Sequence, residues 1–189
     1  MEKAVARKII LIILAIFVVL GFISSFFSSD KTSNVPSPNT GGTQEGTKTN
    51  FAVGDKITVD NVDYVVNEVF TLPVVGSEYA NKEADGIFVI VSIEIKNNKN
   101  NEIFLTSGDF KLKDSQGRTY NADASAGFYL DTMGYKSFMF KQLGAGLSTK
   151  GEIVFDVPKD DTGLVLEISG EGIFSGSKNV VIGDVANLK

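Results

Sequence analysis

Apolar and polar residues alternate with a period of two along much of the chain after residue 50. In residues 86–97, branched apolar residues occupy every second position: Ile87, Val89, Val91, Ile93 and Ile95. The opposite face begins with Phe88 and Ile90 and then becomes polar from Ser92 onward. This period is typical of a β-strand. The segment is therefore predicted to be a central strand of a sandwich, buried on both faces at one end and half exposed at the other.

Shorter runs rich in β-forming residues lie on either side of this strand. They cover 56–60, 62–70, 110–113, 152–158, 164–169 and 179–183. Turn-forming residues separate them, at 54–55, 60–61, 97–101, 114–117 and 158–163. No long stretch after residue 50 shows the apolar stripe of an amphipathic helix. The pattern predicts an all-β fold, an immunoglobulin-like antiparallel β-sandwich of seven or so short strands. A small barrel is the alternative.

The N-terminal part of the chain has a different pattern. Residues 1–8 contain Lys3, Arg7 and Lys8, whereas residues 9–29 carry no charge. A helix of that length spans about 30 Å, the thickness of a hydrocarbon core. Basic residues stay on the cytoplasmic side of a membrane. The sequence therefore predicts a cytoplasmic segment 1–8 and a single transmembrane helix at 9–29 that contacts membrane lipid, with the C-terminal part outside the cell.

Two features refine this organisation. Residues 9–29 also resemble the apolar part of a cleaved signal peptide, which would leave a secreted protein, although Val19 and Gly21 make a poor cleavage site. Residues 30–50 are rich in Ser, Thr, Asn, Gly and Pro, and such a segment buries too little surface to fold. We expect a disordered linker at 30–50 and one folded domain at 51–189.

The composition excludes several kinds of chemistry. The chain of 189 residues contains no His, no Cys and no Trp. Disulfides, thiolate nucleophiles and a lipidated Cys are therefore impossible, and the commonest general base and metal ligand is missing. From Asp30 onward there are 15 basic and 22 acidic residues, a net charge of −7. This charge repels phosphate backbones, so no nucleic-acid partner is expected.

Three kinds of candidate site remain, and most of them are better explained as ordinary turns or solvent-facing strand residues. Residues 156–163 contain three Asp residues that are capable of binding Ca²⁺, but their spacing favours an ordinary turn. The Gly-rich segments 143–151 and 169–177 lack the Gly-Lys-Ser/Thr sequence of a phosphate-binding loop. Carboxylate pairs lie on charged strand faces rather than in apolar surroundings. We therefore expect no catalytic residue, no cofactor and no metal.

The aromatic segment 127–140 is the strongest candidate for a contact surface. Tyr129, Met133 and Tyr135 are its proposed partner-facing residues, because Tyr and Met are enriched at interfaces. In the same segment, Phe138 and Phe140 are predicted to line the interior of a strand. The alternative is that the whole segment belongs to the core, with the tyrosines covering the end of that strand.

The order of these blocks resembles a DUF4352-type domain. The matching residues are VGDKITVDNVDYVVNEV, GIFVIVSIEIKNN, FKLKDSQGRTY, LSTKGEIVFDVPKDDTGLVLEIS and NVVIGDV. The resemblance implies a secreted or membrane-tethered immunoglobulin-like domain of bacteria or archaea, similar in fold to a mycobacterial secreted antigen. It implies no activity and no catalytic residues. Such domains often carry Pro-Gly before the Gly-Glu strand, where this chain has Ala145-Gly146, and Gly146 still permits a positive φ.

These observations predict a membrane-anchored extracellular domain that binds an unidentified protein or envelope partner and is not an enzyme. Two other functions are considered. A structural envelope spacer would have no concave site and no exposed aromatic patch. A hydrolase would need a cleft with two carboxylates flanking the scissile bond.

Overall fold

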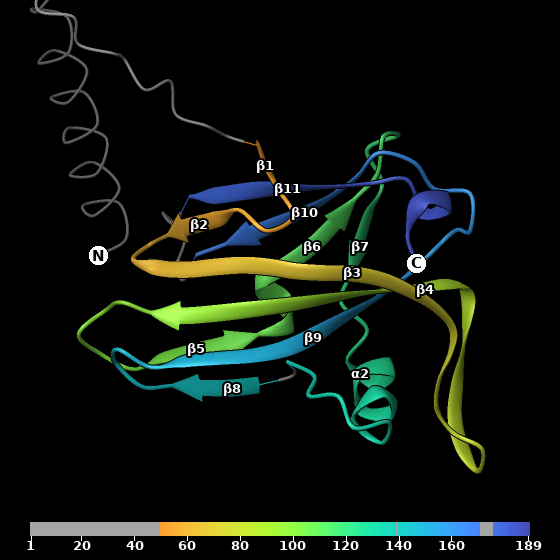
Figure 1. The fold of residues 1–189 in the computed structure, drawn as a ribbon, viewed down its shortest axis with the longest axis horizontal. Helices are drawn as coiled ribbons and strands as arrows, with labels where there is room; N and C mark the ends of the chain where they lie inside the picture. The colour runs from red at the N-terminus through yellow and green to blue at the C-terminus, as the bar shows by residue number, and fades with distance from the viewer. Residues whose placement is uncertain (1–49, 139, 171–175) are drawn as a thin grey trace, which may run out of the picture. The chain divides into compact units, whose positions relative to one another are not determined.

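The computed structural model describes residues 50–138, 140–170 and 176–189 (Figure 1). The predicted cytoplasmic segment 1–8, the predicted anchor 9–29 and the predicted linker up to residue 49 lie outside the described residues. Among the described residues, no helix is both long enough and apolar enough to span a bilayer.

The described residues form three β-sheets. A five-stranded sheet has the order β1 (Asn50–Ala52), β11 (Ser177–Gly183), β10 (Leu164–Ser169), β6 (Phe110–Lys113) and β7 (Thr119–Asn121). A four-stranded sheet has the order β2 (Lys56–Val59), β3 (Val62–Ser77), β4 (Ala80–Asn97) and β9 (Ser148–Val157). The strands β5 (Ile103–Thr106) and β8 (Phe140–Leu143) form a small third sheet. The remaining elements are the helix α2 (Ala124–Asp131) and the 3₁₀ turns Ser107–Asp109 and Val185–Asn187.

The all-β sandwich predicted from the sequence is confirmed, but its strands differ from the prediction in two ways. The strand pairs are antiparallel except that β1 runs parallel to β11. The prediction of short strands is wrong for β3 and β4, which have 16 and 18 residues. These two strands form one long hairpin because their pairing continues past the edge of the sandwich, from Val62–Asn97 to Ser77–Ala80.

The main core lies between the two larger sheets. The predicted face of β4 is confirmed, since Val89, Val91, Ile93 and Ile95 are fully buried there. They belong to one cluster with Phe110 and Leu166 of the five-stranded sheet. The alternation of the sequence is therefore satisfied directly by burial of every second side chain.

The tight turns agree with the predicted turn residues. Asp60 and Asn61, between β2 and β3, have φ angles of 48° and 60°. Positive φ at both central residues is the requirement of the two-residue hairpin turn that matches the twist of the strands. Gly146 has a φ of 74°, and this confirms that it supports the turn before β9.

A second, smaller core covers the other face of β4. Phe88 and Ile90 pack there with Val154 of β9 and with Ala126 and Leu130 of α2. The helix begins after Asp123, whose side chain accepts a hydrogen bond from the Ala126 N–H at 2.9 Å. Such a cap satisfies one of the free N–H groups of the first helical turn. The sequence analysis predicted no helix here, because eight residues are too few to show a periodic stripe.

The end of the β3–β4 hairpin extends beyond β9, and we call residues 73–86 the finger. Its strands pair from Val74–Glu83 to the closing pair Ser77–Ala80. The pairing is irregular between Leu72 and Val74, where the finger leaves the regular sheet. Figure 1 shows the finger projecting from the sandwich on the side where α2 lies.

Charged residues link the loop after β9 to the β6–β7 turn. The Arg118 guanidinium donates from Nε to Asp114 and from Nη2 to Asp161, and both carboxylates are buried. The Asp161 N–H donates to the Pro158 carbonyl at 3.2 Å, so residues 158–163 form the predicted turn. The Asp161 side chain of this acidic segment is thus held by an Arg.

This arrangement predicts how stability depends on pH. Burial by itself would raise the pKa of Asp114, but hydrogen bonds from Arg118, Tyr120 and the Gln116 N–H outweigh it and lower the pKa to about 2. A carboxyl whose pKa is lower in the folded state stabilises that state above its usual pKa of 3.8. That contribution disappears as the pH falls toward 2.

We therefore expect urea unfolding of the wild-type protein to become easier as the pH falls from about 4 to about 2. Asp114→Asn should be less stable at pH 7 and should lose less further stability over the same acid range. An equally steep acid loss in the variant would contradict this role of Asp114.

Candidate functional site

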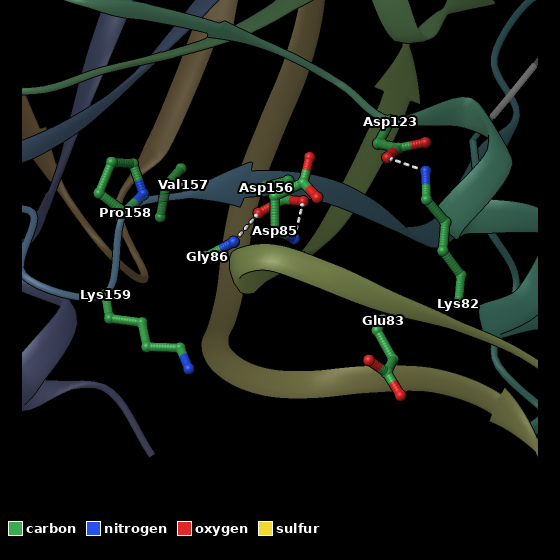
Figure 2. A pocket seen from close by; sticks show the side chains of 9 residues that line it. All are labelled: Lys82, Glu83, Asp85, Gly86, Asp123, Asp156, Val157, Pro158 and Lys159. Atoms are coloured by element: carbon green, nitrogen blue, oxygen red, sulfur yellow. Dashed lines mark hydrogen bonds and ion pairs between the residues drawn. The ribbon is translucent and has the colours of Figure 1, made fainter.

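A cleft of about 760 Å³ lies at the base of the finger (Figure 2). The finger, the end of β9, the loop after it and the residue before α2 contribute to its walls. The lining residues are Lys82, Glu83, Asp85, Gly86, Asp123, Asp156, Val157, Pro158 and Lys159.

Asp156 of β9 fixes the position of the finger. Its carboxylate accepts the N–H of Asp85 at 2.8 Å and the N–H of Gly86 at 3.0 Å. These two residues lie in the irregular part of β4, where the pairing with β3 is interrupted between Phe88 and Glu83. The carboxylate therefore takes the place of the missing β-ladder partners for two backbone donors.

The finger approaches β9 so closely at Gly86 that only glycine fits. A Cβ atom at this position would lie 2.0 Å from the Val157 carbonyl oxygen. Since the Val157 oxygen and the Gly86 Cα both belong to the backbone of packed strands, neither strand moves aside easily. Gly86 and Asp156 together form a rigid base for the finger, directly at the cleft.

Asp156→Asn tests this base. The amide keeps one acceptor oxygen but presents an NH₂ group to the other backbone N–H, so one of the two hydrogen bonds is lost. We expect the free energy of unfolding to fall by about 1.5–3 kcal/mol, the range for hydrogen bonds to a charged group. Hydrogen exchange of the Asp85 and Gly86 amides should accelerate, while exchange in β6 stays unchanged. Unaltered exchange at both amides would contradict the proposed role.

An ion pair closes the opposite end of the cleft. Lys82 Nζ of the finger lies 2.5 Å from Asp123 Oδ2 and 2.7 Å from Ser125 Oγ. Burial raises the pKa of Asp123, but hydrogen bonds from Lys82, the Ala126 N–H and Ser125 outweigh it and hold that pKa below its usual value. Asp123 thus stays ionised while it caps α2 and binds the finger.

The remaining charged groups of the cleft point into open space. In the described part of the chain, the side chains of Glu83, Asp85 and Lys159 are exposed, and none has an ion pair. Four carboxylates and two ammonium groups line the cleft, so its net charge is −2. The cleft therefore offers unpaired negative charge to a ligand.

The two engaged carboxylates of the cleft are not arranged for donating a proton near neutral pH. A carboxylic acid that donates a proton near neutral pH needs a raised pKa. The pKa of Asp123 is instead lowered, and Asp156 is occupied by two backbone donors. Within the described residues, no three acidic side chains form a group able to hold a metal ion.

The three predicted partner-facing residues lie in α2 or just after it, and Met133 contacts the finger. Tyr129 belongs to α2 and packs at the border of the second core. The Met133 sulfur accepts a hydrogen bond from the Gly76 N–H at 3.1 Å. The Tyr135 ring lies 5.8 Å from the Phe70 ring, centroid to centroid. Each residue therefore has an intramolecular contact, while Met133 and Tyr135 also remain exposed.

The prediction for the two phenylalanines of this segment is half right. Phe138 is 3% exposed and belongs to the main core, as expected. Phe140 is 81% exposed, so the prediction that it lines a strand interior is wrong. The reason is that, among the described residues, β8 pairs only with β5, in the register Thr106–Phe140, and Phe140 occupies the outward face of this small sheet.

Sequence reasoning did not find the cleft. Its paired groups, Lys82, Asp123 and Asp156, are far apart in the chain. The clearest local signal was Asp123, an N-cap residue before a short run of Ala and Ser. Sequence reasoning also did not single out Tyr79, which lies at the tip of the finger and is 94% exposed, whereas Phe128 on α2, 61% exposed, lies within the aromatic segment that it did identify.

Comparison with known proteins gives a family and a fold. The model of the family described as "Domain of unknown function (DUF4352)" matches residues 51–180. A search of curated proteins found no match.

Among solved structures, the yjhA protein of Bacillus subtilis is 14% identical with a TM-score of 0.54, covering 70% of this chain and 98% of its own. A candidate lipoprotein of Bacillus subtilis, ycdA, is 19% identical with a TM-score of 0.52, covering 68% of this chain. This chain spans only 38% of ycdA. The secreted protein MPT63 of Mycobacterium tuberculosis is 10% identical with a TM-score of 0.47, covering 71% of this chain and 95% of its own. The first two likenesses support the β-sandwich fold.

Proposed function

We propose that this chain, which belongs to the DUF4352 family, is a binding module held at the outer surface of a cell membrane. The observation that carries the binding role is the cleft at the base of the finger. Its structural carboxylates are fully engaged, whereas Glu83, Asp85 and Lys159 are exposed at its rim. A rigid, concave surface with unpaired charges is suited to recognising a ligand.

The proposed location rests on the first 50 residues. The uncharged segment 9–29 behind three basic residues would anchor the chain, and 30–50 would separate the domain from the bilayer. The similar fold of ycdA, a candidate lipoprotein, is consistent with a domain that works at a membrane surface.

Binding is favoured over the two other functions. A spacer needs no concave site, yet the domain has a cleft and an exposed Tyr79 on a projecting finger. A carboxylate hydrolase needs one acid with a raised pKa, and the pKa of Asp123 in the cleft is lowered. We therefore assign no catalytic residue and propose that the protein is not an enzyme.

Two experiments on intact cells test this proposal. Protease added to protoplasts should digest residues 31–189 and leave a small membrane-bound fragment, and full protection of the domain would contradict the orientation. For the binding role, a photo-crosslinking amino acid is placed at Glu83, with the exposed position Glu68 as the control. Discrete adducts from position 83 but not from position 68 would support the cleft. Identical patterns from both positions would contradict it.

A further inference from the structure

One edge of β4 loses its neighbouring strand at the cleft. Over Ile87 to Lys96, β4 pairs with β3 on one side and with β9 on the other. The last pair with β9 is Ile87–Val157. From Gly86 to Ala80, β4 has β3 as its only strand partner within the described residues. The finger therefore presents an open strand edge beyond the end of β9.

The chain itself does not fill this edge. β9 ends at Val157 and is followed by Pro158, which has no N–H to donate to a ladder. The Asp156 carboxylate satisfies the N–H groups of Asp85 and Gly86, the two residues nearest to β9. Toward the finger tip, the backbone at Asn81–Ala84 has no strand partner other than β3 among the described residues. An open edge of this kind is a template for pairing with another chain.

The cleft lies along the same edge. One wall of the cleft is formed by Lys82, Glu83, Asp85 and Gly86. The last residues of β9 form the end of the cleft (Figure 2). The cleft between the finger and the end of β9 is thus open rather than filled by side chains. A strand added there would continue the four-stranded sheet past Pro158.

The charge of the cleft indicates the chemistry of the added strand. Lys82 is already neutralised by Asp123, whereas Glu83 and Asp85 have no ion pair among the described residues. An acidic peptide would be repelled at this position. A segment carrying Lys or Arg would supply the missing countercharge.

We propose that the open edge of β4 at Ala80–Gly86 binds an extended, basic segment of a partner protein as an additional β-strand. This inference rests on the proposed binding function and names its partner class. Main-chain hydrogen bonds to the edge provide affinity, and the carboxylates of Glu83 and Asp85 select Lys or Arg side chains. Since successive side chains of a strand point to opposite faces, the recognised segment has basic residues at alternate positions.

The test uses the full chain in detergent and a synthetic peptide of eight residues in which Lys and Val alternate. A Glu–Val peptide of the same length controls for charge. The Lys–Val peptide methylated at every backbone nitrogen controls for ladder hydrogen bonds. Binding is measured at low salt by isothermal titration, and hydrogen exchange locates the protected amides.

We expect only the unmodified Lys–Val peptide to bind and to protect amides within Asn81–Ala84. The double variant Glu83→Gln with Asp85→Gln should bind about tenfold more weakly, since two partly exposed charge contacts together contribute about 1–2 kcal/mol. Glu68→Gln, which removes an exposed carboxylate outside the cleft, should bind as the wild type does.

Four outcomes would overturn the proposal. They are no binding of the Lys–Val peptide, equal binding of its methylated form, protection of amides elsewhere, or self-association of the chain through this edge. Adducts from position 83 on cells together with any of these results would leave the binding function standing and reject strand addition alone. Absence of cleft-specific adducts would instead reject the function itself.

Discussion

Phe138→Ala should lower the free energy of unfolding by about 3–5 kcal/mol, the usual cost of emptying a large aromatic site in a core. Phe138 is 3% exposed and packs in the main core. Its N–H donates to the Glu152 carbonyl at 2.9 Å, which holds the segment against β9. A Cβ at Gly151 would lie 2.8 Å from the Phe138 ring, so the ring is tightly enclosed and the site cannot collapse readily.

Phe140→Ala is the matched control for this prediction. The same substitution two residues later removes a ring that is 81% exposed, so stability should change by no more than about 0.5 kcal/mol. Urea unfolding followed by circular dichroism measures both variants. If Phe140→Ala were as destabilising as Phe138→Ala, the outward orientation of Phe140 on β8 would be wrong.

Phe88→Ala should have a comparable effect, about 3–5 kcal/mol, but through the second core. Phe88 of β4 is fully buried, and it belongs to one cluster with side chains of β9 and α2. Because α2 has only eight residues, its stability depends on this packing rather than on its own helix propensity. We therefore expect hydrogen exchange in α2 to accelerate more than exchange in β6 and β10.

The exposed ring on the helix itself provides the comparison. Phe128 is 61% exposed, and Phe128→Ala should change the free energy of unfolding by no more than about 0.5 kcal/mol. Equal destabilisation by the two substitutions would show that α2 docks through a different face. A stable Phe88→Ala variant would show that the second core contributes little to the fold.

Much of the fold was predictable because a sandwich is specified by local patterns. Burial of alternate residues in β4 follows from its period of two, and Asp60-Asn61 is a pair that tolerates positive φ. These features depend on neighbours in the sequence. The length of the β3–β4 hairpin was less predictable, because Pro73 and the Gly-Ser-Glu sequence at 76–78 resemble the end of a strand.

The candidate site was largely unpredictable for the opposite reason. Asp156 alternates along β9 like any solvent-facing residue, and only the close approach of Gly86 makes its carboxylate an acceptor for two backbone donors. Likewise, Lys82 and Asp123 are 41 residues apart. The aromatic segment was recognised, but its composition could not distinguish Phe138 from Phe140.

The residue pattern alone indicates an all-β domain, the positions of its turns, and the chemistry that is impossible without His or Cys. Which polar side chains are internal depends on the folded arrangement of the strands. Asn97, predicted as part of an ordinary turn, is fully buried, and its amide donates to the carbonyls of Asn101, Leu143 and Gly144. The alternation of apolar residues indicates which face of a strand is buried, because hydrophobicity is a property of each residue by itself. Partners distant in sequence, such as those of Asn97 and Asp156, depend on how the strands are brought together, and no local preference encodes them.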